Sequence, residues 1–425
     1  MGGGATTAAA SGELRRRLGT FDAVVIGLGA MIGAGIFSAF APAARAAGSG
    51  LLVGLAVAAV VAYCNATSSA RLAARYPASG GTYVYGRQRL GDFWGYLAGW
   101  AFVVGKIASC AAIALTVGLY VWPAQAHAVA VAAVVALTAV NYVGIQKSAL
   151  LTRAIVATVL VVLTVVVAAT LGWGAADMTR LNVGADATVG GVLQAAGLLF
   201  FAFAGYARIA TLGEEVRDPA RVIPRAIPLA LGITLAVYAV VAVAVLLVLG
   251  PQRLAGAAAP LSDAVQAAGI QQLVPVVRLG AAVAALGSLL ALILGVSRTT
   301  LAMARDRHLP HALAAVHPRF AVPHRAELLV GAVVAVLAAT ADLRSAIGFS
   351  SFGVLVYYAI ANASAWTLSR SEGRPPRIIP VIGLAGCLTL AFALPAASVI
   401  SGAAVLTAGA AAYGIRRLVT GRRHR

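Results

Sequence analysis

Recurring apolar runs, each about twenty residues long, constrain this sequence more than any single motif. The chain has 425 residues, of which 61% are hydrophobic and 11% are charged, and it is far more apolar than a soluble domain. Backbone polar groups must be satisfied internally in hydrocarbon, so these runs are expected to be helices. The sequence predicts an all-α integral membrane protein with about twelve transmembrane helices. They begin near Asp22, Leu51, Phe93, Ala128, Leu150, Gly191, Pro228, Leu273, Leu328, Ile347, Ile378 and Ala397. The fourth, ninth and eleventh runs have the shortest or least clearly bounded apolar cores.

The basic residues are distributed unevenly between the two ends of these runs. Lysine and arginine total 32, five of them face outward if the N-terminus is cytoplasmic, and two lie inside spans, which leaves 25 on the cytoplasmic side. This asymmetry follows the positive-inside rule and predicts a plasma-membrane protein with both termini cytoplasmic. The outward residues are Arg45, Arg180, Arg253, Arg278 and Arg344, and those inside spans are Lys106 and Arg208.

The net charge of +19 does not indicate nucleic-acid binding, because the basic clusters are short, separated by spans and free of interleaved aromatic residues. The three cysteines follow no metal or redox spacing, and five of the six histidines fall in predicted loops or the tail without a carboxylate or thiol cluster. Neither a metal nor another cofactor is expected.

Small residues interrupt two of the apolar runs at mid-span. Residues 26–37 read IGLGAMIGAGIF, and residues 200–206 read FFAFAGY. Loosened backbone at this depth is tolerated only where protein or a water-filled cavity satisfies the freed amides and carbonyls, and such breaks usually mark a solute site. Close packing through Gly29 and Gly33 is the alternative explanation for the first break.

The two breaks lie five spans apart, in spans one and six, so the two interrupted helices run in opposite directions through the membrane. This placement is expected of two inverted five-helix repeats. We expect a cytoplasmic N-terminal tail over residues 1–19, a first repeat over 20–184, a second over 185–370, and two additional helices with a basic cytoplasmic tail over 371–425. The loops at residues 71–91 and 214–224 are candidate inner-gate surfaces or ordinary loops.

Three motifs together resemble the amino acid, polyamine and organocation superfamily of secondary transporters. They are residues 27–37, the loop YPASGGTYVY at residues 76–85, and residues 200–224, with a further match, AMARD, at residues 302–306. The resemblance covers spans one to ten. It implies a leucine-transporter-type fold with an inverted five-plus-five repeat, a substrate site where helices 1 and 6 are broken, and alternating access.

The resemblance also assigns substrate contacts. Backbone amides of the first break would hold the carboxylate of an amino acid, and carbonyl groups of both breaks would meet its amine. Phe203 would cap the site as an outer gate, and Tyr206 would line it. The substrate-binding residues expected are Gly29, Ala30, Met31, Ile32, Gly33, Ala34, Gly35, Phe203, Ala204, Gly205 and Tyr206.

The sequence departs from many members of this superfamily just after the second break. Those members carry a carboxylate there, whereas Tyr206 is followed here by Ala207 and Arg208. A cationic substrate would lose its counter-ion, so a neutral zwitterionic amino acid is favoured over a cationic amino acid or polyamine. Arg208 could instead pair with Glu215 on the same helical face. Exchange of amino acids is an alternative to uptake.

Lys106 lies near the middle of span three, where a charge is costly unless it is paired, neutral or functional. We expect it to act in proton coupling or gating, and a structural lysine bonded to carbonyl groups is the rival interpretation. Ser288 in span eight is positioned where sodium-coupled relatives supply oxygen ligands, although helix packing is favoured for it. The expected partners are an amino acid, a coupling proton and the lipid bilayer.

Two other classes of membrane protein fit the sequence less well. An integral membrane enzyme would need polar catalytic groups clustered near one interface, and no such cluster or nucleotide-binding loop is found in the sequence. A channel or receptor would not require a pair of oppositely oriented breaks.

Overall fold

The structure is a computed structural model that describes residues 18–77, 80–144, 149–172, 176–212 and 215–422. The predicted N-terminal tail up to residue 17, Glu214 and the last three residues lie outside these ranges, as do Ala78 and Ser79 of the 76–85 motif. Nothing in the described ranges is a strand, apart from one isolated β-bridge, so the predicted all-α class is confirmed.

Seventeen α-helices follow one another along the described part of the chain, with short 3-10 turns between some of them. Their bounds are α1 Thr20–Met31, α2 Ala34–Ser38, α3 Phe40–Ala47, α4 Leu51–Arg75, α5 Thr82–Leu90, α6 Asp92–Val121, α7 Ala126–Tyr142, α8 Ala149–Gly172, α9 Val189–Phe203, α10 Ala207–Ala210, α11 Pro219–Gly256, α12 Pro260–Ala267, α13 Val274–Arg305, α14 His324–Thr340, α15 Leu343–Trp366, α16 Ile378–Ala393 and α17 Ala396–Arg422.

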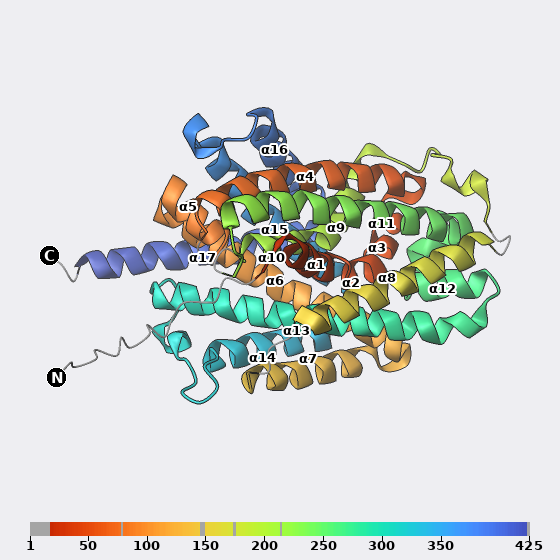
Figure 1. Cartoon of the computed structure of the whole chain (residues 1–425), viewed down its shortest axis with the longest axis horizontal. Coiled ribbons are helices and arrows are strands. Elements are labelled where there is room, and N and C mark those ends of the chain that lie inside the picture. Colours follow the sequence, from red (N-terminus) through yellow and green to blue (C-terminus); the bar gives the residue numbers. More distant parts are fainter. Residues whose placement is uncertain (1–17, 78–79, 145–148, 173–175, 213–214, 423–425) are drawn as a thin grey trace, which may run out of the picture.

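The long helices lie side by side along the longest axis of the molecule, with α1 in the middle of the bundle (Figure 1). The helix α1 packs against α11, α8 and α10, and α9 packs against α3 and α4. On the opposite flank, α6 packs against α15 and α13, and α7 pairs with α14. The interrupted helices are therefore enclosed by the other helices of the bundle.

Ten helical segments in the described ranges are long and apolar enough to cross a membrane. They match ten of the twelve expected spans. The ninth and eleventh runs form α14 and α16, which have 17 and 16 residues and are shorter than a full span. These are two of the three runs whose apolar cores looked short or ambiguous in the sequence. The chain is thus a multi-pass integral membrane protein.

Local sequence explains where several of these helices begin. The Thr188 hydroxyl accepts a hydrogen bond from the amide of Gly191 at 3.1 Å and caps α9, and Asp342 caps α15 in the same way through Ser345. Pro219 occupies the first position of α11, where its missing N–H costs nothing. Near the far end of α11, Gly250 has φ of 68° and bends the helix.

Candidate functional site

The first predicted break is present. The helix α1 ends at Met31, α2 begins at Ala34, and Ile32 and Gly33 lie between them in non-helical conformations. The amide of Ile32 still donates to Leu28 at 2.7 Å and closes α1. Beyond it the regular bonding pattern stops, which leaves the last carbonyl groups of α1 without their helical partners.

Side-chain hydroxyls from two other helices take over two of these carbonyl groups. Ser288 on α13 donates to the carbonyl oxygen of Gly29 at 3.1 Å. Tyr238 on α11 donates to the carbonyl oxygen of Met31 and lies 3.0 Å from that of Ala202. The hydroxyl of Tyr238 therefore joins the end of α1 to the last turn of α9, and buried carbonyls that would otherwise be costly are satisfied.

Other backbone groups at the break are not used by the protein. Among the described residues, none donates a hydrogen bond to the carbonyl oxygen of Ala30, and none accepts one from the amides of Gly33, Ala34 and Gly35. Buried backbone groups are almost always paired, so an acceptor beside a row of donors indicates a place for a polar ligand.

The second predicted break is also present, in a milder form than expected. The helix α9 ends at Phe203, a 3-10 turn covers Ala204–Tyr206, and α10 continues for one turn only. Lys106 on α6 donates to the carbonyl oxygen of Ala204 at 3.4 Å, with only 6% of its surface exposed. The mid-membrane lysine singled out in the sequence is thus in contact with the second break.

The two breaks touch each other through glycine. A β-carbon added to Gly205 would lie 2.4 Å from the carbonyl oxygen of Ala30, and one added to Gly35 would lie 2.7 Å from Ala202. A β-carbon on Gly33 would lie 2.0 Å from the hydroxyl of Ser288. No side chain fits at these points without displacement of its neighbours. Close packing, the alternative given for the glycines, therefore accompanies the breaks.

Burial differs between the two sides of the breaks. Phe203, Ile36 and Phe37 on one side are completely buried, and the ring of Phe203 lies 5.1 Å from that of Tyr238. Gly29 and Ala30 near the end of α1, and Gly205 in the 3-10 turn, are only partly buried. Tyr206 is buried and packs against Tyr358, with ring centroids 5.1 Å apart. The residues of the two breaks therefore differ in burial, with Phe203 fully enclosed and Ala30 and Gly205 partly accessible.

Arg208 lies one turn beyond the second break and has no carboxylate partner among the described residues. Its guanidinium lies 3.5 Å from the hydroxyl of Thr211. The sequence offered Glu215 as an ion-pair partner, and the two side chains do not form that pair in this structure. The charge of Arg208 is therefore not neutralised by a direct ion pair in the described ranges, and Glu215 acts on it only from a distance.

The short helix α5 closes the end of the bundle where α13 ends, in the first of the two candidate gate surfaces. Tyr83 and Arg87 both donate to the carboxylate of Asp306 at 2.5 Å. Tyr83 also lies 2.8 Å from the ring of His308, and burial together with the charge of Arg87 lowers the pKa of that histidine. Tyr85 reaches the carbonyl oxygen of Ala210 at 3.5 Å, so α5 contacts the end of α10.

The second candidate surface carries a contact that the sequence did not indicate. Leu18 and Val216 form a parallel β-bridge, in which the amide of Leu18 donates to Glu215 at 3.1 Å and that of Arg217 donates to Leu18 at 3.0 Å. An ion pair between Asp22 and Arg153 joins α1 to α8 beside it. The segments preceding α1 and following α10 are therefore tied together.

Sequence reasoning missed Tyr238. It stands in the apolar run of α11 as an isolated aromatic residue, and nothing in that run distinguishes it from a lipid-facing tyrosine. Only the packing of α11 against α1 gives its hydroxyl a role.

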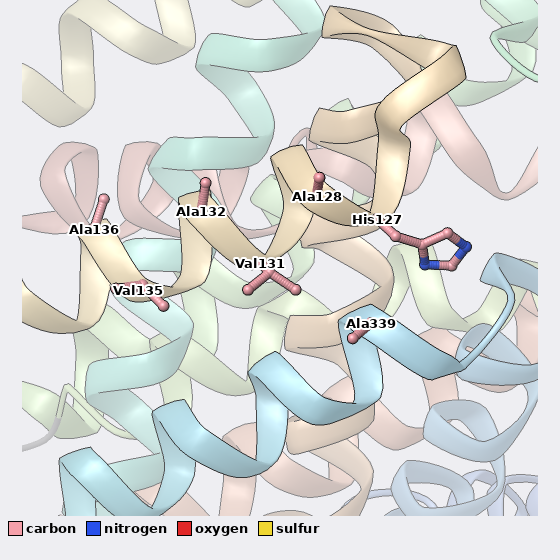
Figure 2. A pocket seen from close by; sticks show the side chains of 7 residues that line it. All are labelled: His127, Ala128, Val131, Ala132, Val135, Ala136 and Ala339. Carbon is pink, nitrogen blue, oxygen red and sulfur yellow. The ribbon is translucent and has the colours of Figure 1, made fainter.

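One hollow in the described part of the structure lies away from both breaks. It is a shallow groove between α7 and α14, lined by alanine and valine side chains with His127 at one end (Figure 2). A second hollow is lined by α6, α14, α15 and α17 and is also mainly apolar. Neither is lined by a residue of the two breaks, and surfaces of this composition suit lipid.

Comparison with known proteins identifies close relatives over almost the whole chain. The family model for amino acid permeases matches residues 18–414. An uncharacterized transporter of Mycobacterium tuberculosis is 82% identical over 96% of this chain and 93% of its own length. The branched-chain amino acid permease of Bacillus subtilis is 28% identical over 90% and 89%. Human cationic amino acid transporter 4 is 30% identical over 86% of this chain and 61% of its own length.

Proposed function

Because the chain belongs to the amino acid permease family and is a transporter rather than an enzyme, we propose that it is a secondary active transporter of neutral, zwitterionic amino acids. It works by alternating access, and its substrate binds between the two breaks. The observation that carries this proposal is the unused backbone at the first break, where one carbonyl and three amides are free of protein partners in the described ranges.

These free groups suit the two ends of an amino acid. The amides of Gly33, Ala34 and Gly35 point from the start of a helical segment and would hold the carboxylate. The carbonyl oxygen of Ala30, with those around Ala204 in the adjoining break, would accept hydrogen bonds from the ammonium group. Phe203 packs over this region and would act as the outer gate.

The proposed architecture follows from the same premise. The short helices α14 and α16 complete a set of twelve spans, with residues 20–184 and 185–370 as inverted five-helix repeats. Residues 371–425 then add two further helices. The uneven distribution of basic residues supports a plasma-membrane protein with both termini in the cytoplasm.

The substrate class is argued from charge. Lys106 and Arg208 stand beside the second break, and neither forms an ion pair with a carboxylate in the part of the chain that the structure describes. A substrate with a cationic side chain would meet two like charges without a counter-ion. The names of the relatives include branched-chain and cationic amino acid transporters, so cationic substrates are the second candidate.

Proton coupling is proposed to act through Lys106. Its charged form needs compensation inside the membrane, and its one described hydrogen bond is long, at 3.4 Å. A neutral amine donates a weaker hydrogen bond than an ammonium group does, so loss of the proton would weaken the contact with the carbonyl oxygen of Ala204. Protonation and the geometry of the second break would then be linked. A fixed lysine that only braces the 3-10 turn is the rival.

Uptake of labelled amino acids by proteoliposomes tests the function. A transporter of neutral amino acids should show saturable uptake of leucine or alanine, and unlabelled substrate inside should accelerate it by counterflow. Arginine should compete poorly. Non-saturable flux would indicate a channel, and flux that occurs only with internal substrate would indicate an obligatory exchanger.

A further inference from the structure

Glu327 is the buried acidic residue that the proposed transport mechanism leaves unused. Glu327 lies in the first turn of α14 and is 0% exposed. Neither oxygen of its carboxylate satisfies the distance and angle criteria for a hydrogen bond with any described residue. A carboxylate that is buried without a partner is strongly destabilised in its charged form. The start of a helix favours negative charge, but this effect is smaller than the cost of burying an unpaired ion.

The surroundings of Glu327 are polar on the side of α7. Thr138 packs against Gly331, one turn beyond Glu327 on α14, and its buried hydroxyl has no hydrogen-bond partner in the described ranges. Asn141, one turn along α7, faces the carboxyl group, and its amide nitrogen donates to the carbonyl oxygen of Leu290 on α13 at 3.2 Å. An amide N–H of Asn141 directed at the carboxyl group favours its charged form, but burial acts in the opposite direction and is the larger effect.

Charged groups reach this cluster from two elements. Arg298 on α13 is exposed and interacts electrostatically with Glu327 without forming an ion pair with it. His324 lies on α14 itself, and its ring contacts that of His317 in the preceding loop, 5.4 Å away. The facing segment of α7 contributes the polar but uncharged residues Thr138 and Asn141.

Arg298 also interacts electrostatically with Arg208, which lies two residues beyond the second break. Glu327, Arg298 and Arg208 thus form a series of charges that runs from α14 across α13 to α10. The charge of Glu215 acts on Arg208 in the opposite sense to that of Arg298. When Glu327 is neutral, it does not offset the charge of Arg298. When Glu327 is ionised, its charge offsets that of Arg298 and weakens the repulsion between the two arginines.

We propose that Glu327 is a proton-binding site separate from the two breaks. Its carboxylic acid gives one proton to water near the start of α14, and the carboxylate left behind is balanced by Arg298. The change in charge alters the electrostatic repulsion between Arg298 and Arg208, which lies next to the proposed substrate site. Proton binding at Glu327 does not depend on the proposed function, whereas its link to transport does.

Infrared spectroscopy of the purified full-length protein in lipid tests the proton site directly. A protonated buried carboxyl has a C=O stretching band that shifts in D₂O and disappears on ionisation. We expect this band in the wild type at neutral pH, its loss at alkaline pH, and its absence from Glu327→Gln. The control Glu372→Gln removes an ionised carboxylate paired with Arg89 and should leave the band unchanged. A band that persists in Glu327→Gln, or is absent from the wild type, would overturn the proposal.

Thermal unfolding gives a second readout that does not require transport. The wild type should become less stable as the pH rises through the titration of Glu327, because ionisation leaves a buried charge. Glu327→Gln keeps the neutral shape and should lose this part of the pH dependence. Equal pH profiles for the two proteins would argue against a titrating group at this position.

The link to transport is tested by uptake at several pH values in Glu327→Gln and Arg298→Gln. Both variants should shift the pH at which uptake is half-maximal, and they should shift it in the same sense. If the infrared band behaves as expected but uptake keeps its pH dependence in both variants, the proton site stands and its connection to Arg208 is overturned. If the wild-type protein shows no saturable uptake at any pH, that result would instead count against the proposed function.

Discussion

The side-chain nitrogen of Lys106 lies 3.4 Å from the carbonyl oxygen of Ala204, so a basic group from α6 contacts the second break inside the membrane. The contact joins two features that are 98 residues apart in the sequence. It places a titratable group where a change of charge acts on the backbone next to the proposed substrate site.

Replacing Lys106 tests this relationship. In Lys106→Met, which keeps the length of the side chain and removes its charge, uptake should no longer respond to an imposed pH gradient, while counterflow persists. Lys106→Arg should fail to restore the response, because arginine does not release its proton. Proteoliposomes with fixed internal pH provide the measurement, and a normal gradient response in Lys106→Met would favour a purely structural lysine.

The contact between the two breaks predicts the effect of a single methyl group. Gly205→Ala places a β-carbon 2.4 Å from the carbonyl oxygen of Ala30, so the helices must separate. Uptake should fall at least tenfold, and stability should fall by about 1 to 3 kcal/mol. Gly232→Ala is the matched control, since nothing lies within 4 Å of the added carbon there, and its uptake should match that of the wild type.

Tyr238→Phe removes one hydroxyl and leaves the packing of the ring unchanged. The carbonyl oxygens of Met31 and Ala202 then lose the single hydroxyl proton that they share, at a cost of about 1 to 3 kcal/mol in stability. The affinity for substrate should fall as the end of α1 becomes less ordered. Scintillation proximity binding measures this affinity, and Tyr63→Phe on an exposed face of α4 serves as the control. Unaltered binding by Tyr238→Phe would show that the hydroxyl does not position the break.

Ser288 provides a test for sodium. Its hydroxyl donates to the carbonyl oxygen of Gly29, so it is engaged in helix contact. Uptake should be the same when external sodium is replaced by choline. Ser288→Ala should lose about 1 kcal/mol of stability without acquiring a new ion dependence. Ser297→Ala, whose hydroxyl bonds within α13, is the comparison, and a sodium requirement that disappears in Ser288→Ala alone would contradict the packing role.

The pH dependence of the α5 contact follows from His308. Burial lowers the pKa of His308 below its ordinary value of 6.5, so the folded protein binds this proton less readily than the unfolded chain does. The stabilising effect of the neutral ring is present above pH 6.5 and is lost as the pH falls toward the lowered pKa. The melting temperature should therefore decrease from about pH 7 to about pH 5, and His308→Gln should reduce that decrease. The exposed His311→Gln should not, and identical slopes for the two variants would refute the assignment.

The sequence was a good guide to the fold wherever composition alone decides the structure. Long apolar runs have few alternatives in a membrane, so the all-α class and ten of the spans could be predicted. The runs that became α14 and α16 are short, and their role as spans depends on how neighbouring helices cover them. A hydropathy pattern does not contain that information.

Glycine and alanine at mid-span indicated both breaks, because residues that loosen a helix have little reason to occur there. The difference between them was not predictable. Gly33 and its neighbours leave the helix altogether, whereas Ala204–Tyr206 only tighten into a 3-10 turn. The hydrogen-bond partners of Lys106 and Met31 come from segments far away in the chain. The sequence alone does not show which carbonyl or hydroxyl group the packing of the helices brings next to them.

The β-bridge between Leu18 and Val216 has a mechanical consequence. Since the segments before α1 and after α10 share two backbone hydrogen bonds, a movement of either helix at this end is resisted by the other. Any opening of the proposed pathway at this end would have to break these two hydrogen bonds or move α1 and α10 together. The ion pair of Asp22 with Arg153 would make α8 move with them.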